Sequence, residues 1–200
     1  MMQLYDYVLS GSCYKVRLFL SMIGKDFETI PVDYYPGGEH KTPEFLEINP
    51  LGQIPVLRDG DLTLRDAQAI LVYLAGRYDT GRTWYPEDAE TQGQIAMWLS
   101  FAGGEIMNSS AARLHDIDKV RAAARAAFRV LDDHLTEREI DGADWIVGDA
   151  PTIADIACFP YVALSGDGGI PLDDYNAIRR WIARFKTIPG FTIMPGIHAN

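Results

Sequence analysis

One stretch of this sequence decides how the rest of the chain is interpreted: Asn49-Pro50-Leu51-Gly52-Gln53-Ile54-Pro55-Val56-Leu57. A turn-forming Asn-Pro-Leu-Gly runs directly into a strand-like Ile-Pro-Val-Leu, in which Pro55 is the second residue. Proline has no N–H to give to a sheet, so it is confined to edge strands, bulges or the first position of a strand. After a tight turn, that position also favours a cis X–Pro bond. A cis Ile54–Pro55 bond would leave the N–H and C=O of Ile54 free to pair with an extended peptide. The alternative is an ordinary turn followed by an edge strand.

The residues around this stretch predict a small α/β unit. Strands are predicted at 3–8 and 27–32, joined by an amphipathic helix that Gly24 ends. A strand–helix–strand unit of this kind is parallel and right-handed. The remaining predicted elements are a short helix at 44–48, a hairpin of residues 55–58 and 61–64 around Asp59-Gly60, and a helix at 66–77. Together they predict one mixed four-stranded sheet covered by helices.

After residue 77 the pattern changes to a purely helical one. A linker rich in Thr, Gly and Pro covers 79–86, and helices are predicted at 87–113, 116–139, 152–164 and 173–186, with a coil tail after Pro189. Thr152 and Asp155 have the spacing of a capping box at the start of the third of these helices. We therefore expect a domain at 1–77, a linker at 78–86 and an all-helical domain at 87–200.

Composition excludes several classes of function. The formal net charge is −10, which disfavours nucleic acid and anionic membranes as partners. No apolar run approaches the length of a membrane span, and the N-terminus lacks the features of a signal peptide. Cys13 and Cys158 are the only cysteines, too few for a disulfide framework and suited to a reducing compartment. We expect a cytoplasmic protein without a bound metal.

Five motifs in order resemble the soluble glutathione transferases over essentially the whole chain. They are Ser10-Gly11-Ser12-Cys13-Tyr14-Lys15-Val16-Arg17 after a strand, Pro43-Glu44-Phe45, Asn49-Pro50 with Ile54-Pro55-Val56-Leu57, Leu64-Arg65-Asp66-Ala67-Gln68-Ala69-Ile70 with Tyr73-Leu74, and the Thr152–Asp155 box. The resemblance implies a thioredoxin-like N-terminal domain followed by an all-helical domain. The placement of the serine is similar to that of the theta, zeta and related bacterial groups.

The resemblance makes Ser10 the hydroxyl that donates a hydrogen bond to the glutathione sulfur, with Ser12 as the alternative. A helix N-terminus favours an anion, which agrees with this role. The simpler interpretation is that either serine only caps the helix. Cys13 stands in a Ser-x-x-Cys pattern; a dithiol mechanism needs two sulfurs, so Cys13 is expected to serve packing.

The resemblance also implies which residues hold the rest of glutathione. Gln53, Ile54 and Pro55 resemble the family's clamp on the peptide backbone. His40 matches a position that contacts the glycine carboxylate in some members, with a solvated loop histidine as the alternative.

At the start of the predicted helix 66–77, Asp66 stands where the family has an acid facing the γ-glutamyl ammonium. The same carboxylate would also suit the helix N-terminus. The next residue is usually Ser or Thr, and here it is Ala67. This departure removes one donor to the γ-glutamyl carboxylate.

By analogy with the family, an electrophile pocket would form between the domains from Leu9, Met107, Ala111 and Arg113, although core packing is the alternative for the apolar ones. The implied activity is conjugation of the glutathione thiolate, as co-substrate, to a small electrophile or reduction of a peroxide, by a homodimer. The alternatives are a glutathione-dependent isomerase or dehalogenase, or a non-catalytic binding protein on the same fold. The sequence does not specify the electrophile.

Overall fold

Four strands form one mixed sheet in the computed structural model, which describes residues 1–114 and 118–197. Strand β1 (Gln3–Asp6) pairs in parallel with β2 (Glu28–Pro31) and antiparallel with β3 (Val56–Asp59). Strand β3 also pairs antiparallel with β4 (Leu62–Leu64), which gives the order β2-β1-β3-β4. The predicted mixed four-stranded sheet and its parallel β1–β2 pair are confirmed.

The start of β3 differs from the prediction. The strand begins at Val56, and the preceding Ile54–Pro55 bond is cis, as expected. Strand β3 lies between β1 and β4, so the alternative of an edge strand is wrong. Proline cannot donate to a ladder, and this central strand therefore starts one residue after Pro55.

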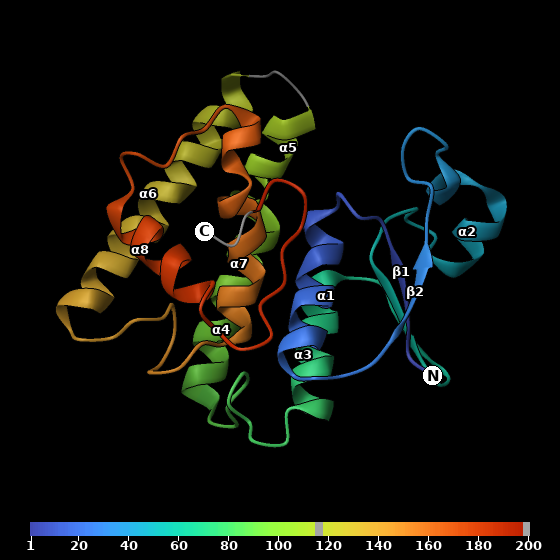
Figure 1. The fold of residues 1–200 in the computed structure, drawn as a ribbon, viewed down its shortest axis with the longest axis horizontal. Coiled ribbons are helices and arrows are strands. Elements are labelled where there is room, and N and C mark those ends of the chain that lie inside the picture. The colour runs from blue at the N-terminus through green and yellow to red at the C-terminus, as the bar shows by residue number, and fades with distance from the viewer. Residues whose placement is uncertain (115–117, 198–200) are drawn as a thin grey trace.

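Helices cover both faces of the sheet (Figure 1). Helices α1 (Gly11–Met22) and α3 (Ala67–Tyr78) lie on the face toward the C-terminal helices. The short helices η1 (Glu39–Lys41) and α2 (Pro43–Ile48) belong to the β2–β3 connection, and α2 covers the other face. There Phe45 packs with buried Val32 and Val56 in a small separate core. The sheet is therefore sandwiched between helices.

The C-terminal domain is all-helical, as predicted, but its first long helix is divided. The segments are α4 (Ala89–Phe101), the π-helical η2 (Ala102–Ile106) and α5 (Asn108–Leu114). The single helix predicted at 87–113 is thus wrong in detail. The Gly103-Gly104 pair lowers helix propensity at the point where the π-helical turn occurs.

Of the remaining helices, α6, α7 and α8 agree with the predictions apart from their ends, whereas the short η3 was not predicted. They are α6 (Asp118–Ile140), α7 (Ile153–Ala163), η3 (Ser165–Gly168) and α8 (Asn176–Phe185). The predicted start of α6 at 116 lies outside the described residues. Helix α8 begins three residues later than predicted, after a turn.

Helix α7 forms the centre of the C-terminal domain and carries the predicted capping box. The Asp155 carboxylate accepts a hydrogen bond from the Thr152 N–H, and the Thr152 hydroxyl oxygen accepts from a backbone N–H in the first turn of the helix. Every residue from Ile153 to Val162 is buried. Such an all-round apolar helix is typical of a domain core.

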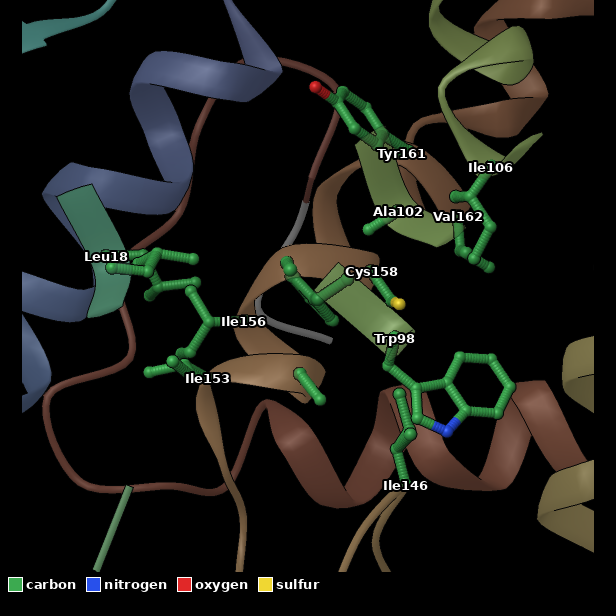
Figure 2. Packing of buried hydrophobic residues seen from close by; sticks show 14 of the residues in the cluster. Leu18, Trp98, Ala102, Ile106, Ile146, Ile153, Ile156, Cys158, Tyr161 and Val162 are labelled. Atoms are coloured by element: carbon green, nitrogen blue, oxygen red, sulfur yellow. The ribbon is translucent and has the colours of Figure 1, made fainter. Parts of the chain in front are cut away.

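One continuous hydrophobic core joins the two domains. Figure 2 shows Leu18 of α1 facing Ile153 and Ile156 of α7, with Trp98 of α4 on the other side. Through this core, α1 and α3 of the N-terminal domain pack against α7. Within residues 1–114 and 118–197, none of the helices has the length and apolar character needed to cross a bilayer.

Candidate functional site

The loop between β1 and α1 presents Ser10 at the helix N-terminus. Ser10 is the N-cap of α1, and its Oγ accepts a hydrogen bond from the Cys13 N–H at 3.2 Å. The Arg17 guanidinium forms an ion pair with buried Asp6 and donates to the Val8 carbonyl at 3.1 Å. These bonds hold the loop in place. The capping interpretation of Ser10 is realised, and because Oγ acts there as an acceptor, its own proton remains available for donation.

The turn before β3 is held by a buried asparagine. The Asn49 amide donates to the Gln53 carbonyl at 2.7 Å, and its Oδ1 accepts from the Leu51 N–H at 3.1 Å. The backbone N–H and C=O of Ile54 have no hydrogen-bond partner in the described part of the chain. They remain free to bind an extended peptide, as the sequence led us to expect.

The start of α3 supplies the third segment of the site. Asp66 is the N-cap and accepts from the Ala69 N–H at 2.9 Å, while its side chain remains exposed. Ala67 follows as the first residue of the helix and is buried. The expected helix-terminal role of Asp66 is therefore realised, and an oxygen atom of its carboxylate remains for a cation.

These three segments meet at one cavity of about 730 Å³ between the domains. Of the predicted site residues, the cavity is lined by Leu9, Ser10, Ser12, Gln53, Ile54, Pro55, Asp66, Ala67, Met107 and Arg113. His40 and Ala111 are not among the lining residues. Residues 103, 107, 110 and 113 follow a helical face toward the cavity, so the intervening Ala111 lies off that face.

The structure adds aromatic residues that the sequence analysis missed. Tyr7, Tyr34 and Tyr35 line the cavity. Tyr34 stacks on His40 with ring centroids 3.9 Å apart and on Tyr7 at 5.6 Å. Burial and the Lys41 cation lower the pKa of His40, which favours the neutral imidazole. Tyr7 and Tyr34 follow the two parallel strands, and ligands bind beyond the carboxyl ends of such strands. Their place in the sequence could therefore have identified them as candidate site residues.

The C-terminal domain forms the opposite wall. A Cβ at Gly103 would lie 2.8 Å from the Gln68 Nε2, so the glycine makes room for this amide at the cavity. Ser110 also lines this wall, and Arg113 pairs with Asp167 at 3.2 Å. Tyr161 of α7 completes the wall. No sequence motif could have identified these residues, since they come from segments that are far apart in the sequence and meet only in the folded protein.

Neither cysteine is a reactive thiol. Burial raises the pKa of Cys13 to about 12 and raises that of Cys158 further. A neutral, buried thiol behaves as a small apolar side chain, which agrees with the expected packing role of Cys13. Among the described residues, no three His, Cys, Asp or Glu side chains cluster closely enough to hold a metal ion.

Family models match both halves of the chain. The model of the glutathione S-transferase N-terminal domain matches residues 1–76, and that of the C-terminal domain matches residues 96–189. The chain belongs to the glutathione S-transferase family. Its fold is the family's thioredoxin-like domain followed by an all-helical domain, as the sequence resemblance implied.

Individual relatives agree with this assignment. Maleylacetoacetate isomerase of Pseudomonas aeruginosa is 30% identical over 90% of this chain and 88% of that protein. Glutathione S-transferase 1 of Dianthus caryophyllus is 48% identical, but the match covers 38% of this chain and 34% of the relative. Among solved structures, Ure2p in complex with glutathione superposes with a TM-score of 0.86 at 27% identity, covering 94% of this chain and 95% of that one. Other relatives are named theta and zeta class transferases.

Proposed function

We propose that this glutathione S-transferase family protein activates glutathione as a thiolate and transfers it to a small electrophile, or uses it to reduce a peroxide. The observation that carries the proposal is Ser10 at the N-terminus of α1, on the wall of the interdomain cavity. A hydroxyl and a helix N-terminus both stabilise a nearby anion. In a conjugation, the thiol proton passes to solvent, the sulfur forms a bond to the electrophilic atom, and the leaving group departs. In the reduction of a peroxide, the sulfur takes up one peroxide oxygen while an alcohol or water leaves, and a second glutathione then displaces that oxygen as water to give glutathione disulfide.

We assign the remaining glutathione contacts to the residues that the family resemblance implied. Ile54 would pair with the cysteinyl unit through its free N–H and C=O, beside Gln53 and Pro55. Asp66 would face the γ-glutamyl ammonium, and the Ala67 N–H its carboxylate. This arrangement leaves Leu9, Met107 and Arg113 for the electrophile.

In this proposal His40 has a different role from the carboxylate contact that the resemblance implied. Its ring stacks on Tyr34, which lines the cavity, while His40 itself does not. We therefore assign it the positioning of Tyr34 in preference to a direct contact with the glycine carboxylate.

A glutathione-dependent isomerase is the second candidate. The match to maleylacetoacetate isomerase over 90% of this chain favours it. In such a reaction the thiolate would add to the substrate and leave again after rotation about the bond, which regenerates glutathione. The cavity and the thiolate would be the same in both cases, and a cytosolic location would suit either.

Calorimetric titration with glutathione, followed by assays with chemically distinct acceptors, tests the proposal. We expect saturable binding and turnover of at least one class: aryl halides, epoxides, peroxides or cis-enones. Turnover of cis-enones with no net consumption of glutathione would favour the isomerase. Binding without turnover of any class would indicate a non-catalytic member of the family, and absence of binding would overturn the proposal.

Ala67→Ser is expected to tighten glutathione binding. A hydroxyl at the start of α3 would restore a donor to the γ-glutamyl carboxylate, and a hydrogen bond to a charged group contributes roughly 1.5–3 kcal/mol before competition with water. We expect a threefold to tenfold lower Kd, or about 0.7–1.4 kcal/mol, with little change in kcat because this contact is remote from the sulfur.

Titration calorimetry on both proteins measures this difference. Ala69→Ser, at an exposed position of the same helix turn, is the matched control and is expected to bind as the wild type does. Equal affinities for Ala67→Ser and the wild type would show that another group, such as the Gln68 amide, already holds the carboxylate.

We also expect a homodimer. Family membership and the exposed Met97 on α4 motivate this, and a partner's copy of exposed Glu105 would reach toward the γ-glutamyl ammonium. Light scattering at micromolar concentration should give about twice the mass of the 22.3 kDa chain. A mass equal to one chain would contradict the expectation.

A further inference from the structure

A fully buried lysine lies directly behind the cavity wall. Lys15 of α1 is 0% exposed, and its Nζ has no hydrogen-bond partner in the described part of the chain. An unpaired amine in a protein core is costly. Its close neighbour is the Tyr161 ring of α7, whose centroid lies 3.8 Å from Nζ. The ring offsets part of the cost through a cation–π contact.

Tyr161 connects this lysine to the cavity. Its hydroxyl lies 2.7 Å from the Ser12 Oγ, and both residues line the cavity. In Figure 2 the Tyr161 side chain extends from α7 with its hydroxyl directed toward α1. The fit is close, because a Cβ at Gly11 would lie 3.3 Å from the Tyr161 ring. Lys15, Tyr161 and Ser12 therefore form one continuous path from the core to the cavity.

We propose that Lys15 and Tyr161 are positioning residues that make Ser12 a second hydrogen-bond donor to the glutathione sulfur, beside Ser10. This inference rests on the proposed function. A cation over the ring draws electron density from the phenol oxygen, so Tyr161 donates its proton to the Ser12 Oγ in preference to accepting one. The Ser12 proton is then free to point into the cavity.

Ser10 is arranged in the same way. Its Oγ accepts from the Cys13 N–H, which leaves the Ser10 proton for the cavity. Each serine thus has an acceptor position occupied by a protein donor, the backbone in one case and Tyr161 in the other. Two hydroxyl donors aimed at one anion stabilise it more than one does, so the alternative between Ser10 and Ser12 resolves into joint action.

Other titratable groups surround this path. Burial raises the pKa of Cys13 on α1 and of Cys158 on α7, so both remain neutral thiols. Asp155 is buried one turn nearer the start of α7 than Cys158, and burial raises the pKa of its carboxyl group. The cavity walls add Asp66 at the start of α3, and the Arg113–Asp167 ion pair.

The test measures the thiol pKa of bound glutathione by ultraviolet difference titration, a readout that requires no electrophile. Lys15→Met keeps the volume of the side chain and removes the charge. Tyr161→Phe keeps the ring over Lys15 and removes only the hydroxyl. We expect each to raise the thiol pKa by about one unit. The double variant should show no more than the larger single shift, because both act through Ser12.

Thermal unfolding separates this role from a structural one. Lys15→Met removes an unpaired amine from the core, so its Tm should equal or exceed that of the wild type. A merely structural lysine would change Tm and leave the thiol pKa unchanged. Lys25→Met is the matched control, because the Lys25 Nζ lies 4.4 Å from the Tyr78 ring centroid, outside the cavity lining. It should leave the thiol pKa unchanged.

The outcomes are distinct. An unchanged thiol pKa in Tyr161→Phe, with glutathione still bound, would overturn the inference and leave the proposed function standing. The same result in Lys15→Met alone would remove Lys15 from the path. If Lys15→Met does not fold, Tyr161→Phe still decides. Failure of the wild type to bind glutathione would overturn both the proposed function and this inference.

Discussion

Ser10→Ala is expected to lower kcat by about ten- to a thousandfold while glutathione still binds. Ser10 lies on the cavity wall at the N-terminus of α1, where its hydroxyl would stabilise the thiolate. Loss of one preorganised donor to a developing anion costs a few kcal/mol of transition-state stabilisation. Glutathione binding should largely persist, because the contacts with Ile54 and Asp66 do not involve this hydroxyl. Steady-state kinetics and calorimetry measure the two effects separately.

The helix-capping role of Ser10 requires a control. Removal of a cap alone costs about 1 kcal/mol of stability, so Ser10→Ala should also lower Tm slightly. Thr42→Ala removes the equivalent cap of α2, where Thr42 accepts from the Phe45 N–H, and should cost similar stability without a comparable loss of kcat. Ser10→Thr keeps a hydroxyl and should retain most of the activity. Wild-type activity in Ser10→Ala with an inactive Ser12→Ala would transfer the main role to Ser12.

Asp155→Ala is expected to cost roughly 3–5 kcal/mol of folding free energy. The buried carboxylate accepts from the Thr152 N–H at 2.8 Å, the Trp181 Nε1–H at 2.9 Å and the Ile146 N–H at 3.2 Å. The Thr152 hydroxyl also donates to it at 3.3 Å. Removal of the carboxylate leaves these donors buried without their partner, and each such group costs about 1–3 kcal/mol. For a chain of this length Tm should fall by about 10 °C. Calorimetry or urea unfolding measures the change.

Two variants distinguish this network from an ordinary helix cap. Asp88→Ala removes an exposed bond to the Thr91 N–H at the start of α4, and should lower the free energy of unfolding far less than Asp155→Ala does. Trp181→Leu removes one of these donors together with a large core side chain, and should cost about 3 kcal/mol. If Asp155→Ala does not fold, the loss of native signal at 25 °C agrees with the expectation, whereas a cost similar to that of Asp88→Ala would contradict it.

Local signals predicted most of the fold. The strand–helix–strand unit, the Asp59-Gly60 hairpin and the Thr152–Asp155 box appear in the structure where the sequence placed them. Each depends on residues a few positions apart, so hydrophobic period and turn chemistry suffice. The division of residues 87–113 at the π-helical η2 was not predictable in this way, because a helical period continues through a single wide turn.

The candidate site was predictable only in part. Ser10, Gln53, Ile54 and Asp66 stand in motifs that the sequence displays in order, and the structure brings them to one cavity. Tyr161 joins them from a distant segment, through packing between α1 and α7.

The sequence by itself determined most elements of this protein, its family and the loops that carry the proposed glutathione contacts, because these depend on short-range chemistry. Only the tertiary structure decided which residues of the helical domain reach the cavity. The placement of Lys15 beneath Tyr161 depends on how α1 packs on α7. The two residues are separated by most of the chain. Their contact forms only when two buried helix faces pack together, so no local sequence pattern predicts it.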